Sequence, residues 1–131
     1  MKKDILAIIL ATVWVSASEF FRNQFLFKSV WIQHYNNLGL IFPSSTINGI
    51  VWVLWSFLVS VAIYFITKKF TLLQTTFLSW VMVFVLMWLV IGNLGILPYS
   101  LIAFAIPLSF IEIFVATVII VKTMNKAKSS T

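Results

Sequence analysis

The sequence predicts an all-α integral membrane protein, a four-helix bundle with an interfacial helix between the first and second transmembrane helices. Of its 131 residues, 62% are hydrophobic and 9% are charged, whereas soluble domains carry about 25% charged residues. Four apolar runs approach or reach the roughly 20 residues that cross a bilayer as a helix. These runs cover residues 5–21, 47–67, 70–91 and 99–121. A chain of this length has room for one domain, so residues 1–131 are predicted to form a single transmembrane domain.

The first run has features of a secretory signal peptide as well as those of a transmembrane helix. Lys2 and Lys3 precede its apolar core, and small residues follow the core at 16–18. Asp4, however, lies where signal peptides prefer only positive charge. We therefore expect the run to be retained as the first helix.

Short polar signals mark the ends of the next helices. Only Lys68 and Lys69 separate the second and third runs, which predicts a tight antiparallel hairpin. Thr71 followed by Gln74 has the spacing of a capping box and would begin the third helix. Residues 44–46 are candidate caps for the second helix.

Residues 22–46 form the predicted interfacial segment, which is too apolar for a loop in water. Phe27, Trp31 and Tyr35 recur at four-residue intervals and would place one aromatic helix face in the headgroup region. Gly39 would end this helix. Two interpretations stay open: the segment anchors the outer face of the bundle, or it is a lid over a site that opens outward.

The same segment carries a short sequence pattern. Leu-Phe-Lys at 26–28 is followed by Trp31 and then by Leu-Gly at 38–39, just after the first predicted helix. This order resembles a pattern in uncharacterised small four-helix bacterial membrane proteins, which are grouped as domains of unknown function. The resemblance implies a four-helix membrane fold and no activity, substrate or catalytic residue.

Basic residues are distributed unevenly between the predicted helix ends. Four helices place both termini on one side of the membrane, and that side would carry most of the nine basic residues: Lys2, Lys3, Lys68, Lys69, Lys122, Lys126 and Lys128. The other side would carry only Arg22 and Lys28. Because cytoplasmic segments are enriched in lysine and arginine, we predict a multi-pass protein of the cell (inner) membrane with cytoplasmic N and C termini.

One carboxylate lies near the middle of the fourth run. An ionisable side chain at membrane depth is costly unless it faces protein or water, so Glu112 marks a candidate site. Ala105, Ser109 and Ala116 share its helix face, and these small residues would let another helix approach closely. Pro107 removes a helical hydrogen bond beside this face. We predict that the face points into the bundle.

A polar stripe follows the outer half of the first helix, where Glu19, Arg22 and Asn23 recur at helical spacing. One asparagine begins the second helix and another ends the third on the same predicted side. We expect these groups to surround an outward-facing cavity with Glu112 at its floor. The predicted ligand- or ion-binding residues are Glu112, Glu19, Arg22, Asn23, Asn48, Asn93 and Ser109. The alternatives are a local Glu19–Arg22 ion pair at the interface and a Glu112 that only packs helices.

Two further patterns concern helix packing. Hydroxyl groups of the second and third helices are predicted to form interhelical hydrogen bonds; they belong to Ser56, Ser60, Tyr64, Thr75, Thr76 and Ser79. Ala7 and Ala11 have the small-xxx-small spacing of close helix contacts, which favours a homo-oligomer.

The composition also narrows the function. The absence of cysteine excludes disulfides, thiolate-bound zinc and iron–sulfur clusters, and a single histidine excludes haem held by two histidines. We expect no metal, no cofactor, no nucleic-acid partner and no catalytic residue, which argues against an enzyme. The lipid bilayer is the expected partner, and a membrane-protein partner stays open. Two functions remain: binding or transport of a small ligand or ion through the polar cavity, or a non-enzymatic accessory subunit that binds lipid or a larger membrane complex.

Overall fold

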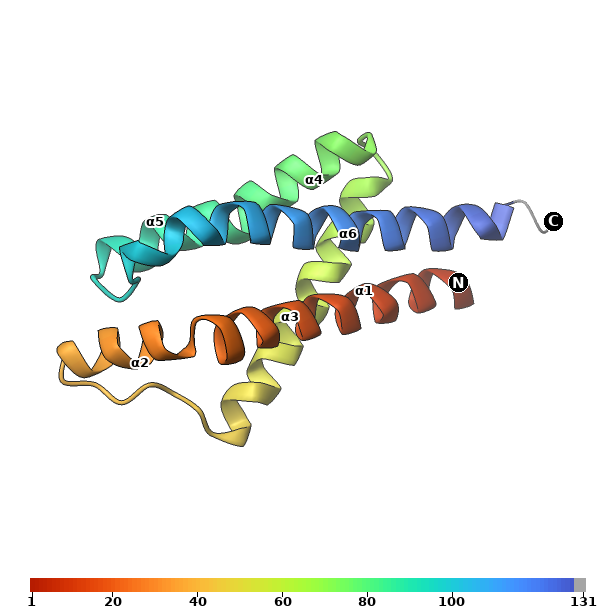
Figure 1. The fold of residues 1–131 in the computed structure, drawn as a ribbon. Coiled ribbons are helices and arrows are strands. Elements are labelled where there is room, and N and C mark those ends of the chain that lie inside the picture. The colour runs from red at the N-terminus through yellow and green to blue at the C-terminus, as the bar shows by residue number, and fades with distance from the viewer. Residues whose placement is uncertain (129–131) are drawn as a thin grey trace.

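The computed structural model describes residues 1–128, and within them every regular element is a helix (Figure 1). Four of the described helices are long and apolar enough to cross a membrane: Lys2–Leu26, Thr46–Thr67, Leu72–Asn93 and Tyr99–Asn125. The predicted all-α class and the four apolar helices are confirmed.

The first long helix extends further than predicted. α1 (Lys2–Phe20) runs directly into a π-helical turn, η1 (Phe21–Leu26). The amide of Phe27 donates to the carbonyl of Arg22 at 3.0 Å, which is the i to i−5 bond of a π helix. Because this wider turn keeps its backbone donors bonded, the helix does not end at residue 21, and it includes the start of the predicted interfacial segment.

A separate helix, α2 (Lys28–Asn37), follows at once, and residues 38–45 then form an extended connection. Gly39 ends α2 as predicted: its φ is 71°, a conformation that favours glycine. The amide of Leu40 donates back to the carbonyl of Tyr35 at 2.9 Å, which satisfies one of the carbonyls left free at the helix end.

The second half of the chain contains another π-helical turn. Its elements are α3 (Thr46–Thr67), α4 (Leu72–Trp80), η2 (Val81–Val85), α5 (Leu86–Asn93), η3 (Tyr99–Leu101) and α6 (Ile102–Lys128). The predicted capping box begins α4: Gln74 donates its amide to the Thr71 hydroxyl at 3.3 Å, and its side chain accepts from the Thr71 amide at 3.1 Å.

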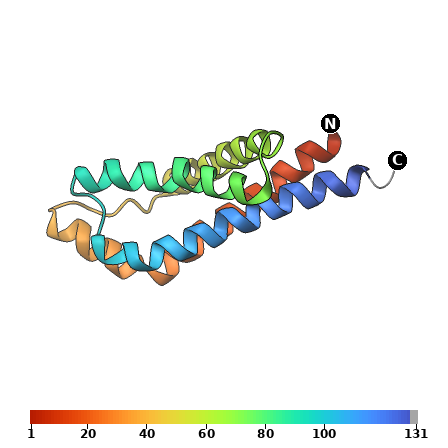
Figure 2. The same cartoon turned by 90° about the horizontal axis from the view of Figure 1, so that it is seen from above.

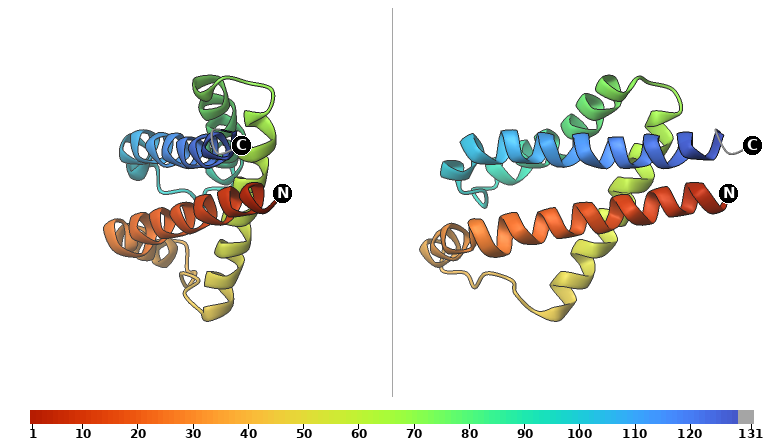
Figure 3. Two further views of the ribbon diagram at one scale, coloured as in Figure 1. Left: turned by 90° about the vertical axis from the view of Figure 1, so that its right-hand side faces the viewer. Right: turned by 45° about the vertical axis from the view of Figure 1, so that its right-hand side comes forward.

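The helices pack around the antiparallel pair α1 and α6, which places the start of α1 and the end of α6 at the same end of the molecule (Figures 1 and 2). α4 packs on α6, and α3 packs across α1. Figure 3 shows α3 crossing the pair obliquely, so this helix departs from the parallel alignment of a regular four-helix bundle.

Small side chains allow α1 to approach its neighbours. Ala7, Ala11 and Val15 have 0% exposure, and they belong to one core cluster with Ala116 and Ile120 of α6, which are also fully buried. The small-xxx-small spacing therefore serves close helix contacts inside the chain. The homo-oligomer stays a prediction.

The buried hydroxyl groups do not join α3 to α4, which corrects another prediction. Ser56 donates to the carbonyl of Trp52, and Ser60 donates to that of Ser56, each at 2.9 Å. Thr76 donates to the carbonyl of Leu72 at 2.9 Å. A helical serine or threonine lies close to the carbonyl one turn earlier, so it satisfies its hydroxyl without a second helix.

The close contact of α1 is tested by enlarging one alanine. Ala11→Leu should lower the free energy of unfolding by about 1–3 kcal/mol, because the larger side chain has no space beside α6. Ala17→Leu is the matched control, since Ala17 is exposed on the same helix. Unfolding in mixed micelles, followed by circular dichroism, measures both; equal stability of the two variants would contradict this packing.

Candidate ligand-binding site

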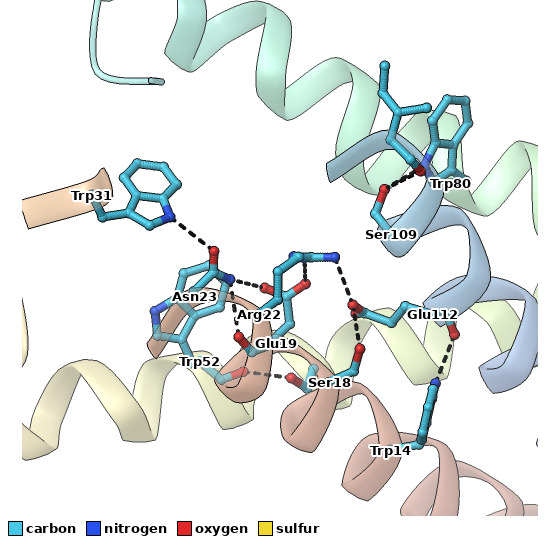
Figure 4. Close-up of polar contacts among 12 residues, drawn as sticks. Trp14, Ser18, Glu19, Arg22, Asn23, Trp31, Trp52, Trp80, Ser109 and Glu112 are labelled. Carbon is cyan, nitrogen blue, oxygen red and sulfur yellow. Dashed lines mark hydrogen bonds and ion pairs between the residues drawn. The ribbon is translucent and has the colours of Figure 1, made fainter. Parts of the chain in front are cut away.

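Arg22, the only arginine in the sequence, joins two carboxylates on different helices. It forms an ion pair with Glu19 one turn earlier, and its Nη1 donates to Oε2 of Glu112 in α6 at 3.1 Å. The side chains of Arg22, Glu19 and Glu112 are only 8%, 5% and 0% exposed. Figure 4 shows the guanidinium between the two carboxylates. The predicted Glu19–Arg22 pair is present, but it is buried and is not merely local, because Arg22 also connects α1 to α6.

Neighbouring side chains hold both carboxylates in place. Ser18 donates to Oε2 of Glu112 at 2.9 Å, and the side-chain amide of Asn23 donates to Oε2 of Glu19 at 2.8 Å. The indole of Trp14 donates to the backbone carbonyl of Glu112 at 2.9 Å. Oε1 of Glu112 is buried without a hydrogen-bond partner among the described residues. One carboxylate oxygen of the cluster therefore has no hydrogen-bond donor in the described structure.

The two π-helical turns meet at this cluster. Arg22 belongs to η1, and Phe84 belongs to η2. The guanidinium carbon of Arg22 lies 5.1 Å from the centre of the Phe84 ring, within the range of a cation–π contact. π-helical turns inside α-helices often occur at functional sites, so the contact between these two turns indicates a candidate site.

A cavity of about 510 Å³ adjoins Arg22 between α1, α2, α3, α5 and the start of α6. Its volume falls in the range of about 300–1,000 Å³ that is usual for small-molecule sites. Its polar lining consists of Glu19, Arg22, Asn23, Gln24 and Asn48. Its aromatic lining consists of Phe27, Trp31, Tyr35, Phe42, Trp52, Phe84 and Trp88. We call this space the α2 cavity.

Two hydrogen bonds hold α2 over the cavity. The indole of Trp31 donates to Oδ1 of Asn23 at 3.1 Å (Figure 4). Nε2 of His34 lies 3.0 Å from the carbonyl oxygen of Gly95, and because a carbonyl only accepts, His34 is the donor. The Trp31 bond is partly buried and the His34 bond is exposed, and each is a single contact, so α2 is attached more weakly than the long helices are packed.

Four predicted site residues meet as the sequence suggested. Glu19, Arg22, Asn23 and Asn48 all line the α2 cavity. Glu112 lies behind Arg22 and does not form the cavity floor, which corrects its predicted place. The guanidinium separates this carboxylate from the open space.

The two other predicted residues lie outside the cavity. Ser109 is fully buried on the predicted face of α6, but it accepts a hydrogen bond from the indole of Trp80 at 2.9 Å and packs α6 on α4. Asn93 is exposed at the end of α5 and does not line the cavity. The helix reaches the predicted side, but this side chain points away from the site.

The sequence reasoning missed the aromatic walls of the cavity. Trp52 and Trp88 face the same space as Glu19, and so does Phe84. Aromatic residues make up 17% of the chain, and this high content was the only sign of an aromatic site in the sequence. In a membrane protein it is ambiguous, because tryptophan is also common at membrane interfaces and in packing.

The site offers charge and apolar surface without a reactive set of groups. No group of three histidine, aspartate or glutamate residues in the described part of the chain could hold a metal ion. Comparison of the chain with protein-family models, curated proteins and solved structures finds no match. The chemistry of the site therefore follows from its own residues.

The importance of the guanidinium is tested by removing it. Arg22→Ala leaves two carboxylates without their countercharge, and we expect a loss of about 3–5 kcal/mol in the free energy of unfolding. Adding Glu19→Gln and Glu112→Gln to the same chain removes those charges and should restore most of the loss. Unfolding in mixed micelles measures each variant. A triple variant as unstable as Arg22→Ala would show that the charges are not the cause.

Proposed function

We propose that this chain is a multi-pass protein of the cell (inner) membrane that binds a small ligand in the α2 cavity from the side opposite its termini. The observation that carries the proposal is the cavity itself, in which a buried ion cluster forms one wall and aromatic rings form the others. Buried charges are costly, and a packed structural core needs neither such charges nor an open space beside them.

The distribution of lysines supports the orientation. The start of α1 and the end of α6 lie at one end of the molecule, with Lys2 and Lys3 exposed on α1 and Lys122 exposed on α6. The cavity lies under α2, toward the other end of α1. With basic residues retained on the cytoplasmic side, the cavity faces the exterior.

The weak attachment of α2 supports the role of a lid. This helix covers the cavity through Trp31 and Tyr35, and the described structure holds it there by the Trp31–Asn23 and His34–Gly95 hydrogen bonds. Opening it costs two hydrogen bonds and some aromatic contact, which is modest beside the disruption of a long helix. In the closed position α2 turns Trp31 and Tyr35 toward the cavity.

The orientation is tested with single cysteines, because the chain has none of its own. Ser44→Cys lies in the connection before α3, and Lys69→Cys lies in the turn before α4; both positions are exposed. A membrane-impermeant maleimide applied outside spheroplasts should label Ser44→Cys and leave Lys69→Cys unlabelled until the cells are lysed. The reverse pattern would overturn the proposed orientation.

Access to the cavity is tested by two alanine positions on one face of α6. Ala105 lines the cavity and is 9% exposed, whereas Ala116 is 0% exposed in the packed core. A small impermeant methanethiosulfonate reagent applied outside should modify Ala105→Cys and not Ala116→Cys. Adding Trp31→Ala should speed the modification of Ala105→Cys several-fold, because it removes one bond that holds the lid. Failure to modify Ala105→Cys in either background would favour an accessory subunit with a closed interior.

A further inference from the structure

We propose that the α2 cavity selects lipophilic organic cations, in which an ammonium or phosphonium centre carries alkyl or aromatic groups. This inference rests on the proposed binding function and names the class of its ligand. It follows from the Glu19 carboxylate on the cavity wall, the aromatic rings that share this wall and a second pocket that leads to the exposed surface.

The ion cluster has one carboxylate more than it has countercharges. One guanidinium faces Glu19 and Glu112, and Oε1 of Glu112 accepts no hydrogen bond from the described residues. Within the described part of the chain, no lysine lines the cavity. Glu112 lies behind Arg22, whereas Glu19 lies on the cavity wall, so the carboxylate that attracts a positive ligand is that of Glu19.

The same geometry disfavours an anion. Arg22 is the only cationic side chain on the described cavity wall, and its two terminal nitrogens already donate to Glu19 and Glu112. An anionic ligand would therefore meet a guanidinium whose charge is already shared by two carboxylates, and it would lie close to the like charge of Glu19.

Aromatic rings supply the rest of the recognition. Seven of the residues that line the cavity are aromatic: Phe27, Trp31, Tyr35, Phe42, Trp52, Phe84 and Trp88. The faces of such rings attract organic cations, and tryptophan does so best. Trp52 lies beside Asn23 and Glu19 in Figure 4, so an aromatic face and a carboxylate are close to the same space.

A second pocket extends this space between α1 and α3. It has a volume of about 220 Å³ and shares six lining residues with the cavity, namely Glu19, Asn23, Gln24, Pro43, Asn48 and Trp52. Its other lining includes Phe20 and Val53, which are 69% and 52% exposed on the outer faces of their helices. Those faces would contact lipid in a membrane, so the apolar groups of a ligand have a path into the cavity.

The test compares two probes of the same shape and opposite charge, tetraphenylphosphonium and tetraphenylborate. The full chain in phosphatidylcholine nanodiscs is titrated with each probe by calorimetry, and titrations of empty nanodiscs are subtracted. We expect saturable binding of the phosphonium at least tenfold tighter than that of the borate. Glu19→Gln should weaken phosphonium binding about tenfold. Asp4→Asn, at the other end of α1, is the matched control and should leave it unchanged.

A second pair of variants keeps the test independent of the ion cluster. Trp52→Leu removes an aromatic face and should weaken phosphonium binding more than Trp52→Phe, which retains one. Equal or tighter binding of the borate, reduced by Trp52→Leu, would overturn the cation class while leaving the binding function in place. Absence of binding by both probes would also overturn the class, and the modification of Ala105→Cys would then decide whether the binding function stands.

Discussion

The shared guanidinium of Arg22 is the interaction on which the outer half of this molecule depends. Glu19 comes from α1 and Glu112 from α6, and within the described part of the chain neither carboxylate forms an ion pair with another cation. A buried charge without a partner is strongly destabilising, so the three groups fix the register of α1 against α6. Deeper in the core, small apolar residues pack the same two helices but would tolerate sliding more readily, because apolar contacts have little directionality.

The two π-helical turns explain how the cluster and the lid fit together. η1 carries Arg22 inward and lets the helix continue to Leu26, from which the chain enters α2 almost without a break. η2 presents Phe84 to the guanidinium. Each π turn places one extra residue in its helix and so changes which side chains face inward. Arg22 of η1 and Phe84 of η2 both line the α2 cavity.

Much of the fold could be predicted from the sequence, and much of the site could not. The apolar runs predicted the four long helices, and the small residues around Glu112 predicted its buried helix face. Both features depend on local periodicity in the sequence. The Arg22–Glu112 contact joins residues far apart in the chain, and π turns have no simple residue pattern, so neither could be derived. Asn93 was misplaced because a helix end fixes the side of the membrane but not the direction of one side chain.

The structure also bears on how a ligand would leave. Between the cluster and the end that carries the termini, the core contains Val15, Ile63, Ile113 and Ile120, all fully buried. Hydroxyls at the same depth, such as those of Ser60 and Thr117, are bonded to carbonyls of their own helices and offer little to a solute. The described conformation therefore has no continuous polar path from the cluster toward the N-terminal end of α1. If binding leads to transport, α1 and α6 must separate at the Arg22 cluster, so that binding and passage depend on the same ion pairs.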